Sequence, residues 1–145
     1  MKVFDDPNVL KLFEVYETDN SLYLIMDYLA GGPFSSRVKR AGKLPEKQAI
    51  KYLLSILLGI QHLNEKGVMH RDLKPDNIMI RSDKGDDLVI VDFGLASFVN
   101  VKEYIFSRCG TPGYVAPEIA NLKDPKGKYT AVCDLFSAGV ILHLM

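Results

Sequence analysis

Residues 68–79 read VMHRDLKPDNIM, and no other part of the chain carries as much chemical information. The stretch places Asp72, Lys74 and Asn77 within six positions, between a segment with helical periodicity and one that is typical of a strand. A carboxylate, an ammonium group and an amide therefore lie close together between two secondary-structure elements. Such a concentration of different polar groups indicates a reaction site.

A predicted hairpin adds a second carboxylate to this group. Two short apolar segments, residues 78–80 and 88–91, flank the turn-rich sequence RSDKGDD and predict an antiparallel pair. In such a pair, the residue that enters the first strand lies beside the residue that leaves the second strand. Asn77 and Asp92 are therefore expected to meet at the open end of the hairpin, next to Asp72 and Lys74.

Phosphoryl transfer from a nucleotide needs the groups that these segments supply. It uses divalent cations that bridge phosphate oxygens, and Mg²⁺ takes hard oxygen ligands such as those of Asn77 and Asp92. It also uses a positioned acceptor hydroxyl and a cation that faces the developing charge, which are roles for Asp72 and Lys74. The sequence thus predicts a phosphoryl-transfer site.

The N-terminal part of the chain predicts another hairpin, followed by a connector. Residues 9–16 and 21–28 are rich in branched and aromatic side chains, and the TDN sequence between them is a turn signal. Gly31, Gly32 and Pro33 then interrupt regular structure. A short helix is expected over residues 34–40.

Two longer helices are expected further along the chain. Pro45 is a good first helical residue, and apolar side chains recur with helical spacing over residues 49–63, ahead of Gly67. Additional apolar residues widen this face, so we expect the helix to be buried against several neighbours. Residues 95–128 lack periodicity and predict a long ordered loop, and the last residues predict a helix capped by Thr130.

Composition and charge narrow the class of protein. The 145 residues fit one domain, and 48% hydrophobic with 25% charged residues is ordinary for a folded globular protein. The 18 basic and 18 acidic residues cancel, so neither nucleic acid nor a membrane is an expected partner. The sequence shows no apolar run long enough to cross a bilayer, and Cys109 and Cys133 have no metal-site spacing. A cytoplasmic location with two free thiols is expected.

The order of the motifs points to one family. HRDLKPDN, a strand, a turn, a strand, DFG and APE follow one another as in the signature set of protein kinases. Residues 1–145 resemble the eukaryotic protein kinase domain of the serine/threonine type, since Lys74 follows Asp72 by two positions and Thr111 lies in GTPGYVAPE. The stretch SRCGTPGYVAPEI is similar to the calcium/calmodulin-dependent group.

The resemblance implies a fold and a set of partners. The fold class is α+β, a partial protein kinase-like fold. Residues 1–30 form the end of the N-terminal β lobe and the hinge, and residues 31–145 form an incomplete, mainly helical C-terminal lobe. The implied cofactors are ATP and Mg²⁺. The implied partners are a protein substrate that carries serine or threonine and a regulatory protein.

The resemblance also assigns roles to particular residues. Asp72 becomes the catalytic base, Lys74 and Thr111 act beside it, and Asn77 and Asp92 hold the magnesium ion. Other residues are implied to bind ATP, to stack in an internal spine or to anchor the catalytic loop. The implied ATP-binding residues are Met26, Asp27, Leu29, Met79 and Asp92; those of the spine are Leu12, His70 and Phe93; the anchor is Asp134.

A regulatory pair is expected in the loop after Asp92. Ser107 lies two positions before Cys109, where related kinases are often phosphorylated. A phosphate there adds nearly two negative charges, and the guanidinium of Arg71 is suited to pair with it. Phosphorylation is therefore expected to order the loop and to bring Thr111 to the catalytic residues.

Some parts of the family pattern are missing from the sequence. No GxGxxG motif occurs, and neither the strand lysine nor its helix glutamate is found. We therefore expect the chain to be a fragment of a longer kinase that is inactive alone. Two alternatives stay open: a truncated binding or regulatory module, and a small-molecule phosphotransferase, against which Lys74 and GTPGYVAPE argue.

Overall fold

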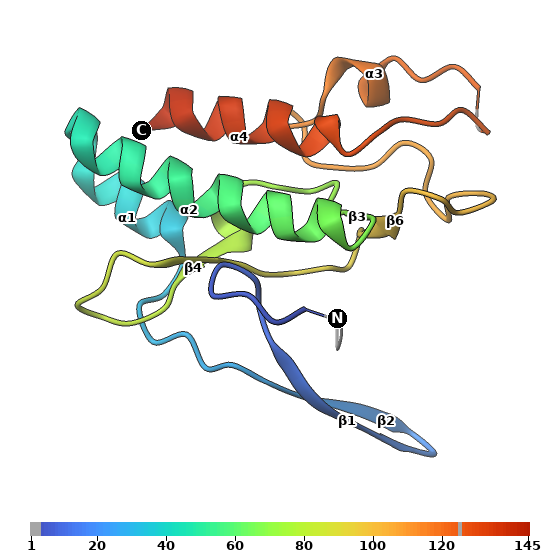
Figure 1. Cartoon of the computed structure of the whole chain (residues 1–145), viewed down its shortest axis with the longest axis horizontal. Helices are drawn as coiled ribbons and strands as arrows, with labels where there is room; N and C mark the ends of the chain where they lie inside the picture. The colour runs from blue at the N-terminus through green and yellow to red at the C-terminus, as the bar shows by residue number, and fades with distance from the viewer. Residues whose placement is uncertain (1–3, 125) are drawn as a thin grey trace.

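The computed structural model describes residues 4–124 and 126–145. A two-stranded hairpin projects from a body in which two long helices lie side by side (Figure 1). A third, shorter helix and a second hairpin complete the body. The described residues contain three separate two-stranded sheets, which matches the predicted α+β class.

The projecting hairpin consists of β1 (Leu12–Thr18) and β2 (Ser21–Met26), which pair antiparallel. It confirms the first predicted hairpin, but its first strand begins three residues later than expected. Val9 and Leu10 are buried, and they contact Ile90 instead, since Leu10 N donates to the Ile90 carbonyl at 2.9 Å. The N-terminal segment is thereby fastened to the body before the hairpin starts.

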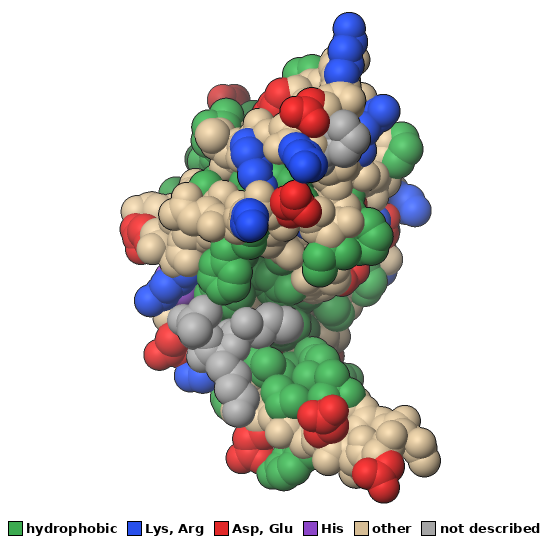
Figure 2. Space-filling model, turned by 90° about the vertical axis from the view of Figure 1, so that its right-hand side faces the viewer, with side chains coloured by type: hydrophobic (Ala, Val, Ile, Leu, Met, Phe, Trp, Pro, Cys, Tyr) green, Lys and Arg blue, Asp and Glu red, His purple; other side chains and the backbone are tan. Residues whose placement is uncertain are grey.

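Most side chains of the hairpin are exposed on both of its faces. Among the exposed apolar ones are Tyr16, Leu22 and Tyr23, each more than half accessible. Two strands alone cannot bury two faces, so these side chains face solvent. In Figure 2, hydrophobic and acidic side chains lie together on the part of the molecule that projects at the bottom.

The predicted helices are present. They are α1 (Phe34–Ala41), α2 (Glu46–Glu65) and α4 (Val132–Leu144), and Pro45 directly precedes α2. The apolar positions of α2 that face the body are buried, including Tyr52, Ile56 and Leu63. The expectation that α2 would be buried on several sides is wrong for its other face within the described residues, because Ile50 and Leu54 are each 56% exposed.

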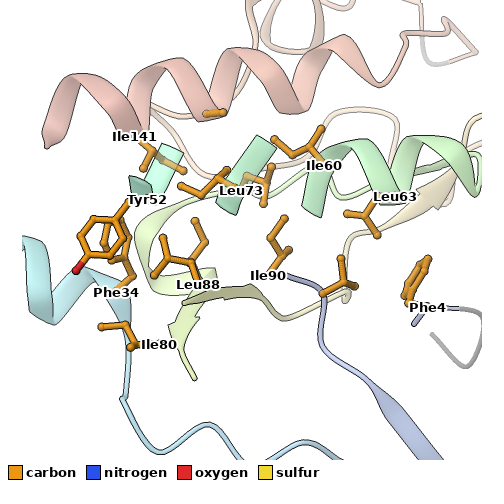
Figure 3. Close-up of a cluster of buried hydrophobic side chains, with 14 of the residues drawn as sticks. Phe4, Phe34, Tyr52, Ile60, Leu63, Leu73, Ile80, Leu88, Ile90 and Ile141 are labelled. Atoms are coloured by element: carbon orange, nitrogen blue, oxygen red, sulfur yellow. The ribbon is translucent and has the colours of Figure 1, made fainter. Parts of the chain in front are cut away.

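The core lies between α2 and the second hairpin, which consists of β4 (Ile78–Ile80) and β5 (Leu88–Ile90). Ile78 is opposite Ile90 across this pair, which confirms the predicted second hairpin. The largest buried cluster extends from Phe4 at one end to Ile141 of α4 at the other (Figure 3). The catalytic loop, residues 70–74, lies between Val68 and β4, which it enters through the short 3-10 turn η1 (Pro75–Asn77). Val68 and Ile78 both belong to the buried cluster, so this core fixes both ends of the loop.

Besides η1, three short elements escaped prediction. β3 (Val68–Met69) pairs with β6 (Ser97–Phe98), and α3 (Pro117–Ala120) is a single helical turn. Residues 95–128 are therefore not entirely irregular, but two- to four-residue elements are too short to show periodicity. Thr130 was also wrongly predicted as a cap: the residue before α4 is Ala131, and no side chain caps the helix.

Within residues 4–124 and 126–145, none of the helices combines the length and apolar character needed to cross a membrane.

Close packing at Gly59 of α2 generates a stability prediction. A Cβ atom at this position would lie 2.7 Å from Ile90 Cδ1 and 3.0 Å from the Asn8 carbonyl oxygen, so Gly59→Ala should lower the free energy of unfolding by about 1–3 kcal/mol. Gly139→Ala in α4 is the control, because its Cβ would meet nothing within 4 Å. It should be neutral or stabilise the protein by up to about 1 kcal/mol. Urea denaturation measures both, and equal effects of the two substitutions would contradict the predicted packing constraint.

Candidate active site

Three of the predicted catalytic residues converge on the carboxylate of Asp72. Thr111 Oγ1 donates to Asp72 Oδ1 at 2.6 Å. Lys74 Nζ donates to Asp72 Oδ2 at 3.0 Å and to Thr111 Oγ1 at 2.8 Å. Asn77 Nδ2 donates to Asp72 Oδ2 at 3.0 Å and to the Asp72 carbonyl at 2.9 Å. The loop after β5 thus contributes to the same site as the catalytic loop.

These contacts set the protonation state of Asp72. Burial alone would raise the pKa of its carboxyl group. Hydrogen bonds from Thr111 and Lys74, the positive charge of Lys74 and a hydrogen bond from Asn77 outweigh burial, so the pKa lies below its ordinary value. Asp72 is therefore a carboxylate at neutral pH and can accept a proton.

Asp134 of α4 anchors the loop that carries Asp72. Its Oδ2 accepts the backbone N–H of His70 at 2.8 Å, and its Oδ1 accepts that of Arg71 at 2.9 Å. Asp134 is only 1% exposed, and burial raises the pKa of its carboxyl group. Arg71 has a φ of 68°, a conformation that is costly for a residue with a side chain. The predicted anchor is confirmed, and it holds a strained turn directly before the catalytic residue.

The buried ring of His70 connects the catalytic loop to the segment after β5. Its Nε2 lies 2.9 Å from the Val91 carbonyl, and its Nδ1 accepts the Asp72 N–H at 3.3 Å, so the neutral tautomer with the proton on Nε2 satisfies both bonds. The ring centroid lies 5.2 Å from that of Phe93, as the resemblance implied. The next ring in the stack is that of Phe4, 5.3 Å from Phe93, which was not predicted. Leu12, the expected third member, pairs with Met26 across the hairpin.

The two expected magnesium ligands lie at the open end of the second hairpin. Val91 N donates to the Asn77 carbonyl at 3.0 Å, and Asp92 follows with a φ of 61°. Because the amide nitrogen of Asn77 donates to Asp72, the amide oxygen is left as an acceptor. The Asp92 carboxylate is exposed and accepts the Gly94 N–H at 3.2 Å.

One amide oxygen and one exposed carboxylate are ligands of the kind that Mg²⁺ prefers. Among the described residues, no group of three or more His, Cys, Asp or Glu side chains could hold a metal ion. Asn77 and Asp92 would thus supply two oxygen ligands to a magnesium ion, and water and phosphate oxygens are its usual further ligands.

The predicted ATP-binding residues are only partly brought together. Leu29 and Met79 pack in one apolar cluster with Leu10 and Val89. Met26 ends β2 and is 38% exposed. Asp27 begins the linker between β2 and α1, where its N–H donates to the Lys11 carbonyl at 3.2 Å.

Two tyrosines that sequence reasoning missed surround the guanidinium of Arg71. Arg71 Nη1 donates to the Tyr129 hydroxyl and to the Phe106 carbonyl, both at 2.8 Å, and its Cζ lies 5.0 Å from the centre of the Tyr104 ring. Burial raises the pKa of Tyr129 to about 12, so its hydroxyl stays protonated at neutral pH. The only signal in the sequence was the pair of aromatic residues in a segment without periodicity.

Known proteins resemble the whole chain. Residues 1–145 match the family described as protein kinase domain. The chain is 40% identical over 144 residues to a probable myosin light chain kinase of Dictyostelium discoideum, covering 99% of this chain and 45% of the relative. It is 41% identical over 141 residues to the serine/threonine-protein kinase DCLK3 of Homo sapiens, covering 96% and 21%. It is 39% identical over 146 residues to the CBL-interacting serine/threonine-protein kinase 8 of Arabidopsis thaliana, covering 100% and 32%. The chain thus spans less than half the length of these relatives.

The hydrogen bond between Thr111 and Asp72 predicts a pH effect. Because the folded-state pKa of Asp72 is lowered, its ionisation stabilises the fold above its ordinary pKa, and this contribution is lost as pH falls through the lowered value. Thr111→Val removes one of the lowering hydrogen bonds, so the carboxyl group should titrate at higher pH and the variant should lose this stability earlier on acidification. Carbon-13 NMR titration of the Asp72 carboxyl group measures the midpoint. Thr111→Ser keeps the hydroxyl and should titrate like the wild type, whereas a wild-type midpoint in Thr111→Val would contradict the bond.

Proposed function

Because this chain belongs to the protein kinase domain family, we propose that it carries the catalytic site of a serine/threonine protein kinase. The reaction transfers the γ-phosphate of ATP to a hydroxyl group of a protein substrate. The observation that carries this proposal is the position of Lys74, whose ammonium group contacts both Asp72 and Thr111. A base, a cation and a hydroxyl-bearing loop residue are thereby held in one cluster.

The hydrogen bonds indicate which oxygen of Asp72 receives the proton. Oδ2 already accepts bonds from Lys74 and Asn77, whereas Oδ1 accepts only that from Thr111 among the described residues. Each carboxylate oxygen has two lone pairs, so Oδ1 keeps one for the acceptor hydroxyl. In the transfer step, the substrate oxygen forms a bond to the γ-phosphorus, the bond to the leaving ADP oxygen breaks, and the proton passes to Oδ1.

The remaining residues position and neutralise the nucleotide. The family uses ATP and Mg²⁺ in general. Asn77 and Asp92 would hold a magnesium ion, which would supply positive charge to neutralise the nucleotide when bound. Lys74 lies beside the base, where its charge favours the transferred phosphate. The half-buried side chain of Met79 would lie against the adenine ring. The linker backbone at Asp27 and Leu29 would hydrogen-bond the base.

The test is the loss of phosphate transfer in Asp72→Asn. Removing one general base should lower kcat by about 10² to 10⁴. Transfer of labelled phosphate from ATP to a peptide with one serine measures kcat, for this chain and for the longest polypeptide encoded with it. Asp19→Asn, in the exposed turn of the β1–β2 hairpin, removes the same charge far from the site and should retain activity. Equal rates for Asp72→Asn and the wild type would refute the mechanism, and no transfer by either polypeptide would favour a binding module.

We also propose that phosphorylation of Ser107 strengthens the site. Ser107 follows Phe106, whose carbonyl accepts a bond from Arg71, and Arg71 Nη2 has no hydrogen bond to a described residue. A phosphate on Ser107 has a nearby donor and would fasten the loop that carries Thr111.

The expected result is that phosphatase lowers wild-type transfer about tenfold, by removing a charge-assisted pair. Ser107→Ala should be equally slow and insensitive to phosphatase. Ser55→Ala in α2, far along the chain from the loop that carries Ser107, is the control and should behave as the wild type. Full activity of Ser107→Ala, together with wild-type activity that phosphatase does not change, would count against this switch.

A further inference from the structure

We infer that Arg81 is a positioning residue that holds the linker between β2 and α1 in the shape that presents its backbone to adenine. The linker, residues 27–33, contains no helix and no strand. Its place relative to the second hairpin therefore depends on individual contacts. The inference rests on the proposed nucleotide site.

Arg81 contacts the linker at two points. Its carbonyl oxygen accepts the N–H of Ala30 at 3.2 Å, next to the bond from Gly31 N to the Ile80 carbonyl at 3.1 Å. Its guanidinium reaches back along the linker, and Nη1 lies 3.5 Å from Asp27 Oδ2. One residue therefore fixes both ends of the stretch from Asp27 to Ala30.

The same guanidinium binds a third segment. Arg81 Nη2 donates to the Pro7 carbonyl at 2.7 Å. Pro7 precedes Val9 and Leu10, which are fastened to Ile90 of β5. Arg81 thus joins the linker, the N-terminal segment and the second hairpin, which are distant in the sequence.

The surroundings of the linker explain why these polar contacts matter. An open pocket of about 390 Å³ borders the linker at Asp27, and charged residues make up most of its lining. Apolar packing holds the linker at Leu29, which lies in a cluster with Leu10 and Val89, whereas polar contacts hold it at Asp27. The other nearby cation, Lys11, is paired with Asp5 at 2.8 Å. The lining residues are Asp5, Asp6, Pro7, Lys11, Asp27 and Arg81.

The solvent exposure of the ion pair between Arg81 and Asp27 indicates that it controls the mobility of the linker and not the stability of the whole domain. The side chains of Arg81 and Asp27 are 36% and 22% exposed, and a pair that is this accessible contributes little to global stability. Its loss should therefore change the mobility of the linker more than the unfolding of the domain. A lysine cannot replace it fully, because one ammonium group lacks the planar fork that spans Asp27 and Pro7.

Hydrogen exchange of the chain without nucleotide tests directly whether the contacts of Arg81 with Asp27 and Pro7, here called the clamp, hold the linker. In Arg81→Ala, the amide of Asp27 should exchange roughly two- to fivefold faster, the order expected for a partly exposed pair. The amide of Ala30 keeps its bond to the backbone carbonyl at position 81, so it should stay unchanged, as should those of Ile90 and Val91. Lys84→Ala is the matched control, because Lys84 is exposed on the same turn and forms no bond with a described residue. If Arg81→Ala fails to fold, Asp27→Asn weakens the ion pair and leaves the contact with Pro7. Unchanged exchange of the Asp27 amide in these variants would overturn the inference.

Titration with MgADP and ATP kinetics then test the coupling to nucleotide binding. Arg81→Ala should raise the Kd of MgADP and the KM for ATP roughly two- to fivefold with little change in kcat, Arg81→Lys should be intermediate, and Lys84→Ala should match the wild type. Adding Asp27→Ala to Arg81→Ala should weaken binding less than the sum of the single effects. A mobile linker with wild-type affinity would refute the positioning role. A wild-type chain that binds no adenine nucleotide would refute the nucleotide site, and the exchange measurement still decides whether Arg81 holds the linker.

Discussion

The buried carboxylate of Asp134 holds the catalytic loop in place. It accepts the consecutive backbone N–H groups of His70 and Arg71, which would otherwise be unsatisfied inside the protein. Those two bonds stabilise the left-handed conformation of Arg71, which turns the next residue, Asp72, toward Lys74 and Thr111. The core between α2 and the second hairpin fixes both ends of the same loop.

The site combines opposing electrostatic effects. Burial raises the pKa of Asp72. The hydrogen bonds from Thr111, Lys74 and Asn77, together with the positive charge of Lys74, lower this pKa by more than burial raises it. The anchor Asp134 lies deeper, and burial is the leading influence on its pKa, which is raised. Two carboxylates of the same region therefore serve different purposes: one is ionised and reachable, and the other is buried and structural.

The loop after β5 and the catalytic loop hold each other in place. Arg71 binds the carbonyls of Leu95 and Phe106, and Lys128 binds that of Val101. The Tyr104 ring lies 5.0 Å from Arg71 Cζ and 4.1 Å from Lys128 Nζ. These contacts order an irregular segment without a regular ladder of backbone bonds, and they bring Thr111 to Asp72.

The sequence by itself determined the hairpins, the three longer helices and the cluster of Asp72, Lys74 and Asn77, because periodicity and close spacing are local properties. Motif order also identified the family. Only the tertiary structure decided the stacking of Phe4 on Phe93, the pairing of β3 with β6 and the clamp at Arg81. Each of these contacts joins residues that are far apart along the chain, and their formation depends on how the core packs, which no short pattern of residues encodes.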